Sequence, residues 1–281
     1  MPTFDTQYPI SVRIQAGDGS VHLVATDRTD TVVEVRPRDE SRSSDVWAAE
    51  HTRAEFNDGK LAVTGAKRGL PLFRGGAIDL EIALPTRSRL YVSLESADMR
   101  AEGEFSDVRF ASASGDVEVD VVTGKIKATN ASGSFTVHAA EGGAFVATAS
   151  GNVTIGNLDG DLKFKAASGS LTVDRLRGNV KSRTASGSVT VAAAVYGAVS
   201  AQTSSGAVTV GIAEGTAARL DIITGSGAVT NELQPSDGPE LGDETFALQV
   251  RSGSGDVNIH RASSAHETVR QLPDPAAPSA P

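Results

Sequence analysis

The chain has no cysteine, few aromatic residues and no long apolar run, and each absence excludes a class of protein. Because none of its 281 residues is a cysteine, a disulfide framework and a cysteine-ligated metal site are both excluded. No run of about 18 apolar residues occurs, so we expect no transmembrane helix. The first residues lack the basic and apolar segments of a signal peptide. We therefore expect a cytoplasmic protein, with the cell surface as the alternative location.

Positive charge is also scarce, since 26 Lys and Arg face 35 Asp and Glu for a net charge of −9. Nucleic-acid binding needs a basic footprint, so we expect no nucleic-acid partner. The five histidines lie far apart, without metal-ligand spacing. Among the periodic glycines between Gly115 and Gly206, only two are followed by a carboxylate, Asp116 and Asp161, which is too few oxygens for calcium. We expect neither a metal nor a cofactor.

Glycine, by contrast, is abundant, with 29 residues, and much of it recurs every nine residues. Every second glycine of the series follows a serine, which gives a longer period of 18 residues. A fixed period of this kind is typical of repeat architectures, in which each unit buries its apolar face against its neighbours. The series consists of Gly115, Gly124, Gly133, Gly142, Gly151, Gly160, Gly169, Gly178 and Gly187, followed after a one-residue slip by Gly197 and Gly206.

Between the glycines, apolar and polar residues alternate, as in Val153-Thr154-Ile155. This alternation indicates short strands with one face in a core. We predict an all-β fold, a β-solenoid with about 18 residues per coil, each coil made of two nine-residue strand-turn units. A meander of antiparallel hairpins is the alternative, but it would not bring equivalent residues of successive units side by side.

The Ser-Gly pairs are expected to form the bends of the coils. Glycine tolerates positive φ and serine can hydrogen-bond the local backbone, so we expect a left-handed φ at Gly151. The small or apolar residue seven positions after each periodic glycine, such as Ala149, Leu158, Ala167 or Leu176, is expected to point inward at the corner.

Three regions follow from the period and the composition. Residues 1–100 contain strand patterns without the strict period, and we expect an irregular β N-terminal cap or first coils there. Residues 101–261 form the repeat, with an insertion at 233–245. Residues 262–281 are rich in proline and alanine, which predicts a disordered tail.

Two outward columns of the repeat are candidate surfaces. The first is a threonine column, which either binds an ordered surface such as ice or only stabilises stacked strands; the lack of a second threonine rank favours the second reading. The second is a cationic face that either binds an anionic polymer, a lipid headgroup or an acidic protein, or serves only as a solvated surface. The threonines are Thr136, Thr154, Thr172, Thr190 and Thr209, and the cations are Lys127, Lys163, Lys165, Lys181 and Arg183.

Several segments carry a family resemblance. They read Ala-Ser-Gly-Asp-Val-Glu-Val (113–119), Ala-Ser-Gly-Ser-Leu-Thr-Val (167–173) and Ser-Gly-Asp-Val-Asn-Ile (254–259), with the lead-in Ile-Asp-Leu-Glu-Ile-Ala-Leu-Pro (78–85). From about residue 8 to 261 the chain resembles the bacterial β-strand-repeat family of unknown function that is often labelled "putative adhesin". The resemblance implies a β-solenoid with a binding or scaffolding role.

Our functional hypothesis is a non-enzymatic interaction or scaffold module, with a protein or an anionic polymer as its partner. The alternative is an adhesin-like protein that binds at the cell surface or cell envelope. A carbohydrate-active β-helix enzyme is a third class, but it would need a groove with two suitably placed carboxylates. The outward acids of the repeat are scattered, which argues against an enzyme.

Overall fold

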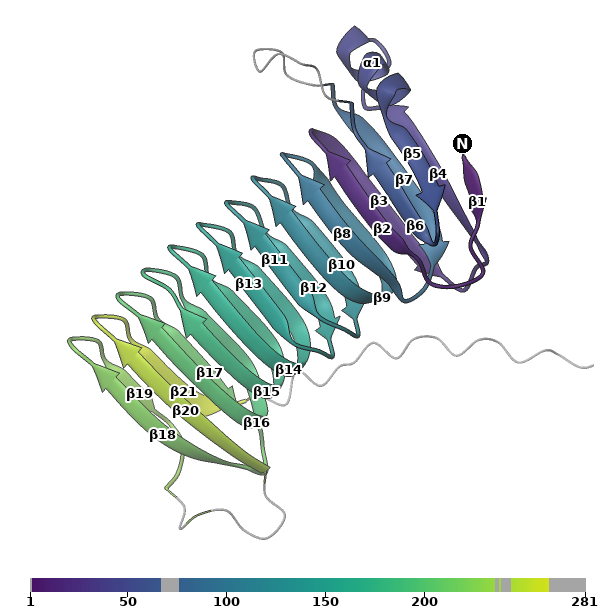
Figure 1. The fold of residues 1–281 in the computed structure, drawn as a ribbon. Coiled ribbons are helices and arrows are strands. Elements are labelled where there is room, and N and C mark those ends of the chain that lie inside the picture. The colour runs from purple at the N-terminus through teal and green to yellow at the C-terminus, as the bar shows by residue number, and fades with distance from the viewer. Residues whose placement is uncertain (1, 67–75, 236–237, 239–243, 263–281) are drawn as a thin grey trace, which may run out of the picture.

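The computed structural model describes residues 2–66, 76–235, 238 and 244–262, and these form a long rod of stacked strands (Figure 1). The all-β class is confirmed, and the single helix of the described residues is α1 (Ser43–His51) at one end of the rod. No helix in this part of the chain is long and apolar enough to cross a membrane. The strands lie in two facing layers, joined by four long strands that bend from one layer into the other.

We name the first layer the threonine sheet, after the column on its outer surface. Its outer strands at one end are antiparallel, and the rest are parallel. In spatial order it contains β1 (Thr3–Asp5), β4 (Asp30–Pro37), β7 (Ile78–Pro85), β3 (Gly19–Thr26), the first half of β9 (Asp98–Ser112), β10 (Val117–Val122), β12 (Phe135–Ala140), the first halves of β14 (Val153–Ala166), β15 (Leu171–Arg183) and β16 (Val189–Thr203), β17 (Val208–Ile212), β21 (Val257–Arg261) and β19 (Val229–Asn231).

The second layer is the cationic sheet. It too begins with an antiparallel strand and continues in parallel pairing. In spatial order it contains β5 (Arg53–Asn57), β6 (Lys60–Thr64), β2 (Ser11–Ala16), β8 (Ser88–Leu94), the second half of β9, β11 (Ile126–Asn130), β13 (Ala144–Thr148), the second halves of β14, β15 and β16, β20 (Glu244–Ser252) and β18 (Thr216–Thr224).

Equivalent residues of successive repeat units lie directly beside each other. Thr154 pairs with Thr172 in parallel register, and the pairing of β14 with β15 runs from Val153 to Lys165 at a constant offset of 18 residues. The hairpin meander is therefore wrong for the repeat. The one-residue slip before Gly197 is a β-bulge, because the register of β15 on β16 shifts by one residue at this point.

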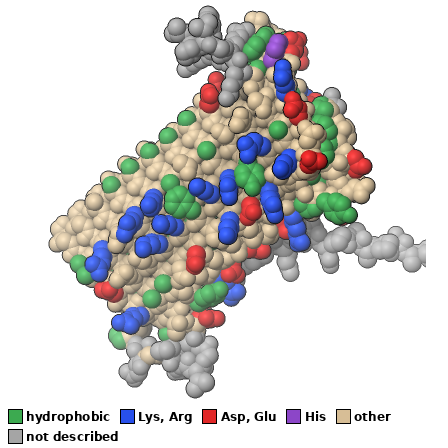
Figure 2. Space-filling view, in the orientation of Figure 1, with side chains coloured by type: hydrophobic (Ala, Val, Ile, Leu, Met, Phe, Trp, Pro, Cys, Tyr) green, Lys and Arg blue, Asp and Glu red, His purple; other side chains and the backbone are tan. Residues whose placement is uncertain are grey.

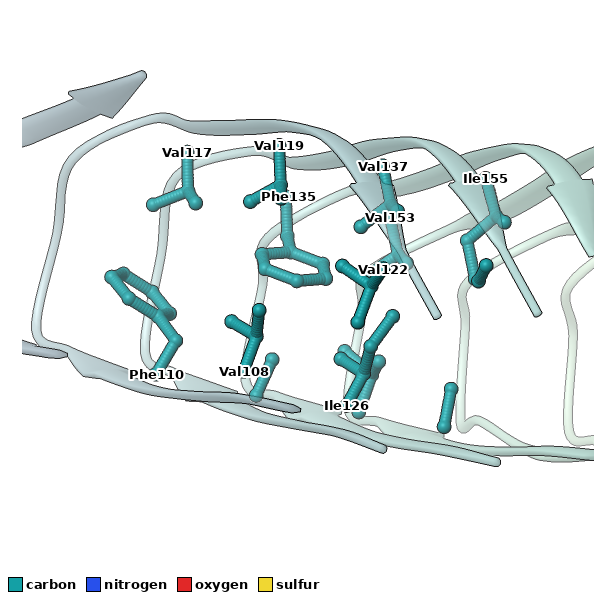
Figure 3. Close-up of a cluster of buried hydrophobic side chains, with 14 of the residues drawn as sticks. Val108, Phe110, Val117, Val119, Val122, Ile126, Phe135, Val137, Val153 and Ile155 are labelled. Atoms are coloured by element: carbon teal, nitrogen blue, oxygen red, sulfur yellow. The ribbon is translucent and has the colours of Figure 1, made fainter. Parts of the chain in front are cut away.

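The core lies between the two layers and is continuous along the rod. Val119 and Val137 of the threonine sheet point toward Val108 and Ile126 of the cationic sheet, with the ring of Phe135 between the layers (Figure 3). All of these side chains are at most 3% exposed. The alternation read from the sequence thus places one residue in two in the core.

The order of the strands in space departs from their order in the chain at both ends of the rod. The first coil of the chain, β2 and β3, lies between β6–β7 and β8–β9. The last coil, β20 and β21, likewise lies between β16–β17 and β18–β19. Each of these two strand pairs therefore has a neighbour on both sides. Segments from further inside the chain lie outside them, namely β4 to β7 (with β1 on β4) at one end and β18 and β19 at the other.

Gly151 has to be glycine for a different reason from the one expected. Gly115 and Gly133 do have positive φ, at 112° and 91°, but Gly151 does not. A Cβ atom at Gly151 would instead collide with the carbonyl oxygen of Gly133 in the neighbouring coil. Close backbone stacking, rather than a left-handed conformation, requires glycine there.

The corner residues agree with the expectation only in every second unit. Leu158 and Leu176 are buried, whereas Ala149 and Ala167, which precede Ser-Gly pairs, are exposed. The inward position belongs to a threonine three residues before the glycine, whose hydroxyl oxygen accepts a hydrogen bond from the glycine N–H. The distances are 2.8 Å for Thr148 and Gly151, 2.6 Å for Thr184 and Gly187, 2.9 Å for Thr203 and Gly206, and 3.0 Å for Thr224 and Gly227.

Two sequence predictions fall mainly outside the described residues. These are the disordered tail, of which only residue 262 is described, and most of the insertion at 233–245. Both stay predictions.

Candidate binding face

The five predicted cations lie on the outer surface of one sheet, which we call the cationic face. Lys163 pairs with Lys181, and Lys165 pairs with Arg183, so these four side chains come from adjacent strands. Strand spacing in a sheet is about 4.8 Å, which places neighbouring cations close enough to act on one ligand. Figure 2 shows lysine and arginine side chains gathered in a band across this face, with few acidic side chains among them.

Residues paired on successive strands form a row that runs along the rod. Lys127 belongs to the row of Lys163 and Lys181, and one aromatic residue separates it from Lys163. Lys127 pairs with Phe145, and Phe145 pairs with Lys163. Phe145 lies between the two lysine positions with its ring partly exposed on the outer surface. The row therefore alternates charge with an apolar surface instead of carrying charge alone.

The row extends beyond the five predicted cations toward the end of the rod that carries α1. Arg109 pairs with Lys127, Tyr91 pairs with Arg109, and Arg13 pairs with Tyr91. The guanidinium carbon of Arg109 lies 5.4 Å from the centre of the Tyr91 ring. Arg109 and Tyr91 could have been found from the sequence, because each precedes the next member of the column by 18 residues.

The row lines an open groove of about 700 Å³. Arg109, Lys127, Phe145, Lys163 and Lys181 all contribute to its wall. A second hollow of about 290 Å³, lined by Arg13, Tyr91 and Arg109 among others, continues the row toward the end that carries α1.

Two acids also line this groove, but each is engaged with neighbouring groups. The Asp107 carboxylate accepts a hydrogen bond of 2.8 Å from the backbone N–H of Lys125, and it lies 3.8 Å from Nε of Arg89. The Asp161 carboxylate accepts a hydrogen bond of 2.8 Å from the side-chain amide of Asn179. None of the five predicted cations forms an ion pair with any acid in the described part of the chain.

The spacing of these acids does not suit glycoside hydrolysis. The two strands β11 and β13 separate the strand positions next to Asp107 and Asp161, with Lys125 and Gly143 directly before them. At about 4.8 Å per strand the two acids are roughly 14 Å apart, beyond the ~5–9.5 Å between paired catalytic carboxylates. Within the described ranges, no group of three or more His, Asp or Glu side chains could hold a metal ion.

The threonine sheet carries charges that neutralise one another. Glu102 lies 3.2 Å from Nε2 of His22 and 2.8 Å from Nε of Arg100. The pKa of the Glu102 carboxyl is lowered from its ordinary value, first by the adjacent His22 ring and then by the hydrogen bond from Arg100. His138 lies 3.1 Å from Glu118. These charges on the threonine sheet are therefore engaged with one another, unlike the five predicted cations of the cationic face.

The threonine column exists as predicted, with Thr136, Thr154, Thr172, Thr190 and Thr209 in register. The next outward positions hold His138, Gly156 and Asp174 rather than a second threonine rank. This arrangement fits a stabilising ladder.

Comparison with known protein families gives a match over most of the chain. The family described as Toastrack, DUF4097, matches residues 7–175 and 156–270. The chain belongs to the Toastrack family. The function of this family is unknown, and the family membership agrees with the resemblance read from the repeat segments. A comparison with curated proteins gives no match.

Solved structures similar to this Toastrack chain share 12–14% sequence identity with it. A candidate adhesin from Bacteroides fragilis NCTC 9343 shares 12% identity, with 92% of this chain and 95% of that chain covered and a TM-score of 0.43. A candidate lipid-binding protein from Parabacteroides distasonis ATCC 8503 shares 14% identity, with 93% and 96% covered and a TM-score of 0.42. A candidate adhesin from Parabacteroides merdae ATCC 43184 shares 13% identity, with 93% and 95% covered and a TM-score of 0.42.

Proposed function

We propose that this chain is a non-enzymatic binding module, a β-solenoid of 18-residue coils whose cationic face binds an anionic polymer. The observation that carries the proposal is the row from Arg109 to Lys181, whose lysines have no acidic partner in the described residues and which lines a groove. An unpaired cation cluster on a protein of net charge −9 costs self-repulsion along the row, and an anionic ligand would relieve it.

The direction of the row favours a linear ligand. Each strand contributes one member, so the row runs along the rod, across the strands. A polymer with regularly spaced sulfate, phosphate or carboxylate groups can place successive charges on Lys127, Lys163 and Lys181. Phe145 offers an apolar surface between the charges, on which the uncharged part of a sugar or backbone unit can pack.

The test is binding of dextran sulfate to the full chain, with neutral dextran as the uncharged probe. We expect wild-type protein to bind dextran sulfate, to ignore dextran and to lose affinity as salt rises through physiological strength. K163E/K181E replaces two attractions by two repulsions, so its affinity should fall by about tenfold or more.

The matched control is R38E/R42E, which makes the same change in net charge. Both arginines are exposed near α1, away from the cationic face, so this variant should bind dextran sulfate nearly as wild type does. An equal loss in both variants would show that only net charge matters and would refute the assignment to the row. No binding by the wild type would refute the proposal itself.

The compartment in which this binding occurs stays a separate prediction. The cytoplasm is expected from the sequence, whereas an adhesin-like role would use the same face outside the cell. Protease treatment of intact host cells, followed by immunodetection, separates the two. Signal confined to the cytosol would end the adhesin alternative, and protease-sensitive signal at the surface would establish it.

A further inference from the structure

The two ends of the rod differ in how their last strands are covered. At the end that carries α1, the antiparallel strands β4 and β5 lie on β7 and β6, and β1 lies on β4 (Figure 1). At the other end, β18 pairs only with β20 and β19 only with β21 in the described part of the chain. One end is covered by antiparallel strands, and the other presents strand edges whose backbone groups have no partner strand among the described residues.

The open end also exposes apolar side chains. Ile223 is 55% exposed and Val229 is 48% exposed, and they are two of the three large hydrophobic residues that are exposed in the described residues. Leu220 and Ile222 on the inner side of β18 pack against the core but are only partly buried. An apolar edge of this length is normally covered by another chain or by a cap.

The sequence of β18 is complementary to itself in antiparallel orientation. If two copies of β18 pair about Leu220, Arg219 of one lies opposite Asp221 of the other, and the reverse pair forms by symmetry. On the same outer side, Ala217 lies opposite the exposed Ile223. On the inner side, Leu220 meets Leu220 and Ala218 meets Ile222. Every cross-strand pair around the centre is therefore either apolar or of opposite charge.

We propose that two copies of this chain join end to end through antiparallel pairing of β18 with β18. The two-fold axis of an antiparallel pair is perpendicular to the sheet, so the cationic sheet continues from one copy into the other. Because the opposite end is capped, the contact closes at two copies and does not propagate into a filament. The proposal stands apart from the polymer-binding proposal, because it rests on β18 alone.

The first test is the mass of the full chain in solution by sedimentation at increasing concentration. We expect a shift from the 28.9 kDa chain to twice that mass, with no larger species. A monomer at every concentration would overturn the proposal, and so would a series of higher oligomers.

Charge exchange at the centre tests the register. Arg219 and Asp221 are both exposed, so their replacement should leave the fold intact. R219D places acid opposite acid and D221R places base opposite base, so each single variant should dimerise about tenfold or more weakly. R219D/D221R restores opposite charges in every pair and should dimerise nearly as wild type does. A dimer unaffected by the single variants, or not recovered in the double variant, would refute this pairing.

A cysteine cross-link gives an independent readout, because the natural chain has no cysteine. A217C mixed with I223C should form a disulfide-linked pair under mild oxidation, since directly opposite residues have Cβ atoms ~4.5–5.5 Å apart. A217C alone should not, because its partner position is residue 223. Equal cross-linking of A217C alone would contradict the register.

Discussion

At the scale of single residues, the repeat is held by contacts that leave no room for one extra carbon atom. The place of a Cβ atom on Gly169 is filled by the carbonyl oxygen of Gly151 in the adjacent coil. We expect G169A to lower the free energy of unfolding by about 1–3 kcal/mol through this overlap. G143A is the control, because the nearest atom to its Cβ would be the Asp161 carbonyl oxygen at 3.9 Å. Urea unfolding measures the stability of both variants. Equal unfolding midpoints for G169A and G143A would show that the backbone at Gly169 has room for a Cβ atom.

A second residue-scale prediction concerns the buried threonine at the corner. Thr184 Oγ1 accepts a hydrogen bond from the Gly187 N–H and donates one to the Gly187 carbonyl oxygen, at 2.6 and 3.0 Å. T184V keeps the shape but leaves both backbone groups of Gly187 without this partner, so we expect a loss of about 1–3 kcal/mol in unfolding free energy. T184S should retain most of the stability. T172V, on the half-buried outer column, should change it little, and a T172V effect as large as that of T184V would contradict the assigned role of the corner.

At the scale of elements, individual strands were predictable from the sequence but their order at the rod ends was not. The alternation at Val257 and Ile259 marks β21 as a strand with one buried face, and the structure confirms both residues as buried. A similar alternation occurs in β17 and in β3, so nothing in the pattern says which strand lies beside which. The order of the strands depends on the connecting segments. The segment between β17 and β18, for example, passes over one strand position, and β20 later fills that position between β16 and β18. A one-dimensional period does not record this.

The inserted last coil leads to a prediction about local stability. β20 lies near the end of the described chain, yet it pairs with β16 on one side and β18 on the other. We expect its backbone amides to exchange with solvent as slowly as those of β15. Among the described strands β5 pairs with β6 alone, so its amides should exchange faster. Hydrogen exchange followed by mass spectrometry on peptides from 244–252 and 53–57 measures the difference. Faster exchange in β20 than in β5 would contradict the insertion.

At the scale of the whole molecule, the two faces have different electrostatic character, and only part of this was predictable. The period places Lys163, Lys165, Lys181 and Arg183 together from the sequence alone. Phe145 was missed because an aromatic residue carries no charge signal, and the arginine and tyrosine further along the row precede the first repeat glycine. Whether a charge is neutralised depends on which side chains meet across strands. His22 and Glu102 are far apart in the sequence, so their contact could not be predicted from it.

The two proposals together predict how the whole molecule holds a long ligand. In the end-to-end dimer both cationic faces lie on the same side, so one polymer can span two rows, and the second contact forms at a high effective concentration. On a surface coated with dextran sulfate, wild-type protein should therefore dissociate on the order of tenfold more slowly than R219D, and R219D/D221R should recover slow dissociation. Inositol hexaphosphate, which is too short to span two rows, should bind all three proteins alike. If R219D is monomeric and still dissociates as slowly as wild type, one row suffices and the dimer has no part in polymer binding.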